Sequence, residues 1–546
     1  MKLTRITAAI SAAALAAVLA GCGSTDGSTA ATGSTTSATS SATATAGASV
    51  TAVLADNQES HASAEDLAYT ESDVVDVTLS GSTATADGDG VKVDGATVTI
   101  TAPGTFRLSG TLAGQVVVDT SATGDVRIIL DDATITSSTT SAIAVMAADE
   151  AVVILADGST NSLTDGSSYG DDTGEANAAL YSAADLTIAG TGALTVTGHS
   201  NDGIGAQDGL VISSGTVTVT AKDDAIRGKD YVRIEGGTTT ATGTGGDALK
   251  SDNVEDADRG YVAVLGGTVD ATAGDDGISA ASDAVVGGGT LTISAAGDGI
   301  HGDVSATIGG GTTTVTKSGE GLEATVITIA GGTLAITSTD DGINGSDGSG
   351  GGGGAGGGGG APGGGGGAPG GESGIAGVSV TVSGGTTTID AGGDGLDSNG
   401  DATITGGTVV VSGPTNDGNG ALDVNGTFTI SGGTLMAVGS SGMAVAPDAD
   451  SEQGWVVATF DSAYPAGTVV QIASGDEVIA TWTADKNFSS VVFSSDAITS
   501  GESYTVYVGG KASGTAVGGM TLEGSTSGAT KLGTVTAGQA PAGRGH

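Results

Sequence analysis

The sequence is poor in cysteine, aromatic residues and basic residues, and each shortage excludes a class of protein. A single cysteine in 546 residues excludes an intramolecular disulfide framework, so packing, hydrogen bonds or bound ions must stabilise the fold. Aromatic residues make up 3%, and 16 Lys and Arg oppose 62 Asp and Glu, for a net charge of −46. That charge disfavours nucleic acids and anionic membrane surfaces as direct partners and makes divalent cations the natural counter-charge.

Glycine is abundant instead, with 101 residues, and Thr, Ser and Ala are frequent. This composition favours short strands and turns over helices. A repeat architecture grows by adding units to one domain, so the length alone does not give the number of domains.

The N-terminus predicts export. Lys2 and Arg5 precede an apolar stretch, Ile6 to Leu19, which has the length of a signal-peptide core and is short for a membrane span. It ends in Leu-Ala-Gly-Cys at Cys22, which resembles the bacterial lipobox. We therefore expect a lipoprotein signal peptide over 1–21 and a protein on the extracellular face of the bacterial cell envelope, lipid-anchored through Cys22. The alternative is a plain secretory signal with an incidental cysteine.

A triplet of the type Asp-Gly-Ile recurs about every 22 residues. Its copies begin at Asp202, Asp224, Asp247, Asp276, Asp298, Glu320 and Asp341, resume at Asp394 and weaken at Gly420 and Ser441. Each unit also carries a Gly-Gly-Thr turn with apolar residues alternating on both sides, which is typical of strands. Three short strands and three turns per unit predict one coil of a parallel β-helix, in which the Ile or Leu of each triplet forms an internal ladder.

The repeat predicts the domain organisation. We expect a Ser/Thr/Ala/Gly-rich flexible tether at 22–70, a β-helix at 71–450 with less regular first coils, and a flexible Gly-rich insertion at 346–374. Residues 451–512 hold 8 of the 15 aromatics, which predicts a small C-terminal β cap. A separate sugar-binding module is the alternative for that segment. A flexible tail follows at 513–546.

The acid of each triplet predicts a column of carboxylates. At a coil spacing of about 4.8 Å and an effective dielectric constant of 20, two such charges repel by about 3.5 kcal/mol. Ca²⁺ bound between coils offsets this repulsion, whereas full solvation as ordinary turn residues is the alternative. The calcium ligands that we expect, including three doubled acids, are Asp202, Asp223, Asp224, Asp247, Asp275, Asp276, Asp298, Asp340 and Asp341.

Six of the 16 bases fall between Lys222 and Arg259, next to two aligned tyrosines. If Val232 and Val262 point inward, Tyr231 and Tyr261 point outward and stack on consecutive coils. Aromatic rings beside cations suit a sugar ring and its carboxylate. The candidate carbohydrate-binding residues are therefore Arg227, Lys229, Tyr231, Arg233, Lys250, Arg259 and Tyr261. The alternative is that these bases only neutralise the carboxylates.

Several ordered motifs together resemble a bacterial carbohydrate-binding β-helix family first known from cellulolytic clostridia. They lie at Thr101–Gly110, Leu163–Tyr169, Ala179–Ser182, Asn201–Ile204 and Asp224–Asp230, within a similarity that runs from about Ser72 to Gly510. The resemblance implies an all-β fold, a right-handed parallel β-helix like that of pectate lyases. It also implies Ca²⁺ binding and non-catalytic binding of acidic plant polysaccharides such as polygalacturonate, and of cellulose.

Two other functions stay open. Pectate lyases share this fold type and use Ca²⁺ with a basic residue to remove a proton next to a carboxylate; here Arg227 or Lys229 would be that base. A structural adhesin without sugar specificity is the other alternative.

Overall fold

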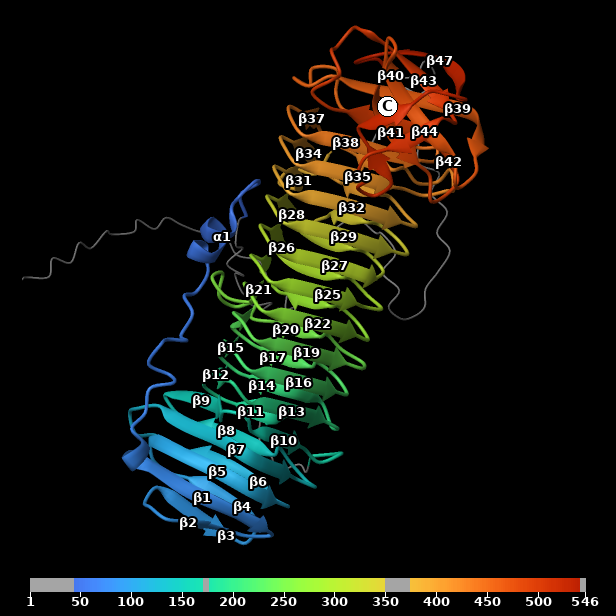
Figure 1. Ribbon diagram of the computed structural model, residues 1–546. Coiled ribbons are helices and arrows are strands. Elements are labelled where there is room, and N and C mark those ends of the chain that lie inside the picture. The colour runs from blue at the N-terminus through green and yellow to red at the C-terminus, as the bar shows by residue number, and fades with distance from the viewer. Residues whose placement is uncertain (1–43, 170–175, 349–373, 541–546) are drawn as a thin grey trace, which may run out of the picture. The chain divides into compact units, whose positions relative to one another are not determined.

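The computed structural model describes residues 44–169, 176–348 and 374–540, and nearly all of its regular structure is β-strand (Figure 1). Within these residues the helical elements are α1 (Val50–Asp56) and a 3-10 helix at Glu71–Asp73. None of the described helices is long and apolar enough to cross a membrane.

The expected signal peptide, the lipid-attachment residue Cys22 and most of the Gly-rich insertion at 346–374 lie outside the described residues. These three features therefore remain predictions.

Forty strands belong to one sheet system in which nearly all neighbours are parallel, as expected for an all-β repeat protein. Through most of the regular repeat a strand pairs with the strand three places later, so the strands form three ladders. The long strands β26 and β28 each span the first two ladders, so pairing there is with the strand two places later. The first ladder carries the Asp-Gly-Ile triplets and comprises β11 (Ala178–Ser182), β14 (Asp202–Ala206), β17 (Ile226–Gly228), β20 (Leu249–Ser251), β23 (Ile278–Ala280), β26 (Ile300–Ile308), β28 (Leu322–Ile329), β30 (Ile343–Gly345), β33 (Leu396–Ser398) and β36 (Leu422–Val424).

The second and third ladders follow the first within each unit. The second comprises β12 (Asp185–Gly190), β15 (Gly209–Ile212), β18 (Tyr231–Ile234), β21 (Tyr261–Val264), β24 (Asp283–Val286), the later parts of β26 and β28, β31 (Ser379–Val382), β34 (Asp401–Ile404) and β37 (Phe428–Ile430). The third comprises β13 (Ala193–Gly198), β16 (Thr216–Ala221), β19 (Thr238–Gly243), β22 (Thr268–Ala273), β25 (Thr290–Ser294), β27 (Thr312–Lys317), β29 (Thr333–Ser338), β32 (Thr386–Ala391), β35 (Thr408–Ser412) and β38 (Thr434–Gly439).

The N-terminal strands are less regular than the later repeat, as expected, because two short strands fold back on them. β2 pairs antiparallel with β1, and β3 pairs antiparallel with β4, before the parallel ladders begin. The strands of this region are β1 (Val74–Gly81), β2 (Ala84–Ala86), β3 (Val91–Asp94), β4 (Thr97–Ile100), β5 (Gly104–Leu112), β6 (Gln115–Asp119), β7 (Val126–Thr136), β8 (Ile143–Ala147), β9 (Glu150–Leu155) and β10 (Thr160–Thr164).

The aliphatic residue of each triplet lies in the core, as the repeat predicted. Ile204 pairs with Ile226 and Ile226 with Leu249, and this register continues to Leu422. These side chains are buried in one continuous hydrophobic cluster, as are the expected inward pairs such as Val232 and Ile234. Burying each such side chain contributes about 1.5–3 kcal/mol, and the contacts join neighbouring units. The units are therefore expected to unfold together.

The second glycine of the Gly-Gly-Thr motif is required by the turn that precedes the third ladder. Gly289 has φ +77° and Gly311 has φ +72°, in the left-handed region. A Cβ at Gly311 would also lie 2.5 Å from the carbonyl oxygen of Gly289 in the preceding unit. The stacked turns thus exclude a side chain here.

The C-terminal cap is larger than expected. Its strand β42 (Phe488–Ser494) pairs antiparallel with β38 and with β39 (Trp455–Tyr464), which ends the parallel stacking. A second, five-stranded antiparallel sheet extends to Thr536, so ordered strands occupy part of the segment 513–546 for which we expected a flexible tail. The remaining cap strands are β40 (Val469–Ser474), β41 (Glu477–Thr483), β43 (Ser503–Val508), β44 (Lys511–Ser513), β45 (Met520–Thr521), β46 (Glu523–Ser525) and β47 (Thr530–Thr536).

The described part of the expected tether is packed, not free. Helix α1 is capped by Ser49, whose side chain accepts a hydrogen bond from the amide of Ala52, and its Val53 is buried beside Tyr231 and Tyr261. The apolar spacing of this helix covers only seven residues, so the surrounding Ser and Ala obscured it in the sequence.

Candidate functional site

The acids of the triplets form a column along the first ladder, which we call the acid column. Each lies two residues before the aligned Ile or Leu, so the acids share one position in successive units. The members of the acid column are Asp202, Asp224, Asp247, Asp276, Asp298, Glu320, Asp341 and Asp394.

Most carboxylates of the acid column accept a backbone hydrogen bond from the next unit. The amide of Asp247 donates to Oδ1 of Asp224 at 2.8 Å, and the amide of Asp276 donates to Oδ1 of Asp247 at 2.8 Å. The same bond recurs from Asp394 to Asp341 at 2.6 Å. One carboxylate oxygen therefore joins neighbouring units, and the other, Oδ2, contacts Asn177 at Asp202 and Lys250 at Asp224 and Asp247.

Beside the acid column runs a second series of side chains, which we call the outer column. Its members directly follow the aligned Ile or Leu and pair with one another from unit to unit. They are Arg227, Lys250, Ser279, His301, Glu323, Asn344, Asp397 and Asp423. The charge of the outer column therefore changes from basic to acidic along the stack.

In the first half of this face, a lysine neutralises two buried acids. Lys250 Nζ lies 2.8 Å from Oδ2 of Asp247 and 3.4 Å from Oδ2 of Asp224. Although burial disfavours the ammonium ion, these two carboxylates outweigh that cost and raise the pKa of Lys250. Lys250 therefore already occupies the position that a metal ion would take between Asp224 and Asp247.

Histidine His301 supplies the next positive charge. Its Nδ1 lies 3.0 Å from Glu323 and 3.7 Å from Asp298, and its Nε2 lies 2.9 Å from Asp303. Burial lowers the pKa of His301, but hydrogen bonds to these acids outweigh burial and raise it to about 12. These acids favour the protonated form of the imidazole, and Asp298, His301 and Glu323 also lie close enough together to hold a metal ion.

Beyond His301 the acids face one another. Burial, followed by the charge of Glu323, raises the pKa of Glu320 to about 8. Burial and the neighbouring Asp341 raise the pKa of Asp397 to about 8, and burial raises that of Asp341 to about 7. Within the described chain, no Lys, Arg or His forms an ion pair with Glu320, Asp341, Asp394 or Asp397.

Asn344 lies inside this acidic half with an unused oxygen. Its Nδ2 donates to Oε2 of Glu320 at 2.9 Å, while its Oδ1 is buried without a hydrogen-bond partner. The side chain is 9% exposed and lies between Glu323 and Asp397 in the outer column. A buried, unpaired carbonyl oxygen among carboxylates is the donor set that a hard cation such as Ca²⁺ uses.

The expected calcium ligands thus fall into two groups. Asp202, Asp224, Asp247, Asp276, Asp298 and Asp341 belong to the acid column, whereas Asp223, Asp275 and Asp340 precede it by one residue. The first member of each doubled acid also turns toward the next unit: a Cβ at Gly246 would lie 2.6 Å from Oδ1 of Asp223. The doubled acids therefore require glycine opposite them, and nothing about their contacts is specific to a metal.

Sequence reasoning missed Glu320, Asn344, Asp394 and Asp397 as candidate ligands. The signal was the residue that follows the triplet, because it comes directly after the inward Ile or Leu and therefore points outward from the same strand. Reading four residues of each repeat instead of three would have found Asn344 and Asp397.

The expected tyrosine platform is stacked but inaccessible. Tyr231 and Tyr261 pair in register with ring centroids 5.1 Å apart and an interplanar angle of 18°, yet both side chains are fully buried. His61 contacts the hydroxyl of Tyr231 at 2.7 Å, and the hydroxyl of Tyr261 donates to the carbonyl of Gln58 at 2.9 Å. The prediction of an exposed sugar platform was wrong, because residues 44–62 cover the rings and the ring faces contact each other.

The five candidate bases are all paired with acids of the chain. Arg227 forms a bidentate pair with Asp252 at 2.7–3.0 Å, and Arg259 lies 2.7 Å from Asp230. The remaining pairs are Lys229 with Glu255, Arg233 with Glu235, and Lys250 with Asp224 and Asp247. These contacts favour the alternative in which the bases neutralise nearby carboxylates.

Comparisons with known proteins point to a family that is named for carbohydrate binding. A family model described as carbohydrate-binding domain-containing protein matches residues 94–354. A carbohydrate-binding domain-containing protein of Acetivibrio thermocellus is 35% identical over 196 residues, which cover 35% of this chain and 68% of the relative. The chain belongs to this family.

Among solved structures, the chain is similar to a polysaccharide lyase-like protein from C. thermocellum, described as a gadolinium derivative. The identity is 29% and the TM-score is 0.37, over 47% of this chain and 92% of that chain. The segment matched to the carbohydrate-binding family includes Asn344, whereas Asp397 and the C-terminal cap lie beyond it.

Proposed function

We propose that this chain is a non-catalytic, calcium-dependent polysaccharide-binding lipoprotein of the cell surface, anchored through Cys22. Its body would be a closed right-handed parallel β-helix. The three parallel ladders and their shared core support closure, and the preferred hand of crossovers between parallel strands supports the right-handed sense.

The observation that carries the proposal is Asn344 Oδ1, buried without a partner among acids. Glu320, Asp341, Asn344 and Asp397 would move together to hold Ca²⁺, which takes six to eight oxygen ligands. Among the described acids and histidines, the ligand atoms that already lie within 4.8 Å of one another belong to Asp298, His301 and Glu323. Ca²⁺ would offset the repulsion that raises these carboxyl pKa values. Water or a ligand would complete its coordination.

The bound ion would also explain how a chain of net charge −46 retains an acidic polysaccharide. Without a cation the protein repels a polyanion, whereas Ca²⁺ bridges protein and sugar carboxylates. Polygalacturonate is therefore the expected ligand class, with cellulose as a neutral alternative. Membership of a family named for carbohydrate binding supports this assignment.

Two alternatives remain. A pectate-lyase-like enzyme would need a free base, yet Arg227 and Lys229 both lie in ion pairs. Release of unsaturated oligogalacturonates in the presence of Ca²⁺ would establish the enzyme. A surface adhesin without sugar specificity would bind no soluble polysaccharide.

Affinity electrophoresis on polygalacturonate, with Ca²⁺ or with chelator, tests the proposal. We expect retardation in Ca²⁺ alone, and its loss in Asn344→Ala and Asp397→Asn. Asp223→Asn, on the self-neutralised half, is the matched control and should bind like the wild type. Binding that persists in chelator would refute the calcium-dependent site.

A further inference from the structure

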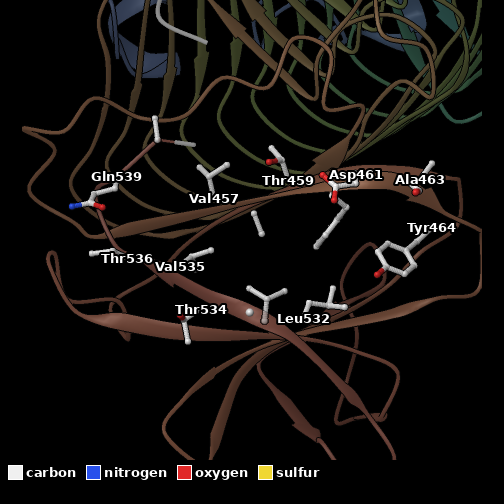
Figure 2. Close-up of a pocket in the computed structure, with 16 residues that line it drawn as sticks. Val457, Thr459, Asp461, Ala463, Tyr464, Leu532, Thr534, Val535, Thr536 and Gln539 are labelled. Carbon is white, nitrogen blue, oxygen red and sulfur yellow. The ribbon is translucent and has the colours of Figure 1, made fainter. Parts of the chain in front are cut away.

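The C-terminal cap contains an open cleft of about 720 Å³, which lies between β39 and β47 (Figure 2). Strand β39 leaves its ladder with β42 after Thr459, because the register passes from Thr459 opposite Ser490 to Tyr464 opposite Phe488. The residues between them bulge out along one wall of the cleft. The volume lies within the range of about 300–1,000 Å³ that is usual for small-molecule sites.

The cleft has an apolar floor and a partly exposed aromatic wall. Val457 and Val535 approach it from the two strands, as Figure 2 shows. Phe460 and Tyr464 meet edge to face with ring centroids 5.2 Å apart. Both rings are half-buried, and Phe488 behind them, 5.9 Å from Phe460 and 5.8 Å from Tyr464, holds them in place. Unlike the covered Tyr231 and Tyr261, these aromatics border open space.

The rim of the cleft is polar and carries little charge. Thr459, Thr534 and Gln539 are exposed at its edge, and each offers a hydroxyl or amide group. Asp461 is the one charged residue among those that line the cleft. Within the described residues no base forms an ion pair with Asp461, and a carboxylate of this kind disfavours an anionic ligand and accepts hydrogen bonds from hydroxyl groups.

We propose that this cleft binds a neutral oligosaccharide of pyranose rings, independently of calcium. Pyranoses combine an apolar C–H surface, which packs on Phe460 and Tyr464, with hydroxyl groups that bond to Asp461 and the rim. The cap lies outside the family match at residues 94–354, so this is a second site, separate from the acidic face. Its existence does not depend on the function proposed above.

Titration of the full mature chain with cellohexaose and maltohexaose, in chelator, tests the site. Trp482 meets Phe488 edge to face with ring centroids 5.4 Å apart, so its fluorescence provides a readout beside calorimetry. We expect saturable binding of at least one neutral hexaose and none of trigalacturonate. Tyr464→Ala should weaken binding by about tenfold, the usual effect of removing an aromatic anchor.

Three further variants separate binding from folding. Thr534→Arg places a long side chain at an exposed rim position and should block the cleft with the fold intact. Tyr507→Ala changes another half-buried cap tyrosine, outside the cleft, and should bind like the wild type. Asp397→Asn, which removes a proposed calcium ligand, should also leave hexaose binding unchanged.

Three results would overturn the proposal. They are the absence of saturable binding, binding that Tyr464→Ala and Thr534→Arg leave unchanged, and binding that requires Ca²⁺. Binding that appears only after truncation at Ala540 would also overturn it, because the chain's own C-terminus would then be the occupant.

Discussion

The two halves of the acidic face differ in how their carboxylates are neutralised. In the first half, Lys250 and His301 lie among the acids and provide the positive charge. In the second half, Asn344 and Asp397 occupy the outer column, and neither side chain carries a positive charge. The core ladder is the same in both halves, so the charge of the outer column is what distinguishes them.

The largest expected effect that separates the halves is a dependence of stability on pH. The pKa values of Glu320 and Asp397 are about 8 in the folded protein, above those of the unfolded chain. The folded state then binds more protons, so the free energy of unfolding should fall as pH rises from about 4.5 to 8, by about 1.4 kcal/mol per pH unit for each titrating carboxyl. Chemical denaturation in chelator at several pH values measures this slope.

The matched variant for that measurement is the triple substitution Glu320→Gln, Asp341→Asn, Asp397→Asn. Its slope should be shallower but not zero, since burial also raises the pKa values of Asp202 and Asp276 to about 7. An unchanged slope would show that the acidic half does not dominate the titration.

Removing the internal cation should make the first half resemble the second. Lys250→Gln leaves Asp224 and Asp247 buried and unpaired, with side chains 7% and 2% exposed, and should cost about 3–5 kcal/mol at neutral pH. Added Ca²⁺ should recover part of that loss. Lys222→Gln, at an exposed lysine near the same unit, is the control and should change stability little. If Lys250→Gln lost no more stability than Lys222→Gln, Lys250 would not be the group that neutralises Asp224 and Asp247.

Calcium should stabilise the wild type through the acidic half. At a Ca²⁺ concentration about 100 times Kd, linkage adds about 2.7 kcal/mol to the free energy of unfolding. Differential scanning calorimetry should therefore give a higher Tm in Ca²⁺ than in chelator. The shift should vanish in a variant that combines Asn344→Ala with Asp397→Asn, and it should persist in Asp223→Asn. A shift that survives the double substitution would place the ion elsewhere.

The smallest expected effect is a gain in stability on replacing a buried threonine of the core. It should be the same in both halves, because both share this core. Thr239 and Thr387 are fully buried in the interior, and their hydroxyl groups have no hydrogen-bond partner. Thr239→Val and Thr387→Val should each raise stability by about 1–2 kcal/mol in urea unfolding. Thr240→Val, at a half-buried neighbouring position, should have almost no effect. Unequal gains would mean that the cores of the halves differ.

Much of the fold was predictable because each unit repeats the same local signals. The Ile and Leu of the triplets and the Gly-Gly turns recur at a constant spacing, so the three ladders and the core positions followed from the sequence. The cap was predictable from its aromatics, but its end at Thr536 was not. Its last strands are short and polar, and pairing with distant strands, not composition, stabilises them.

The column of acids was predictable from the sequence, whereas the partners of each acid were not. The binding of a cation there stays a prediction, and which acids have a partner in the chain depends on side chains from neighbouring units. Tyr231 and Tyr261 point outward as expected, but His61, about 170 residues before the first of them, covers the pair. Spacing within a repeat carries no information on such contacts between distant segments.

By itself, the sequence determined the parallel strands, the inward Ile column and the column of acids beside it, because periodicity and glycine geometry are local properties. The tertiary structure alone decided that the tyrosines are buried, that Lys250 and His301 neutralise one half of the acidic face, and that Asn344 Oδ1 remains unpaired in the other. These outcomes depend on the charges of neighbouring units and on a distant N-terminal segment that covers the tyrosines. The sequence of a single repeat contains neither.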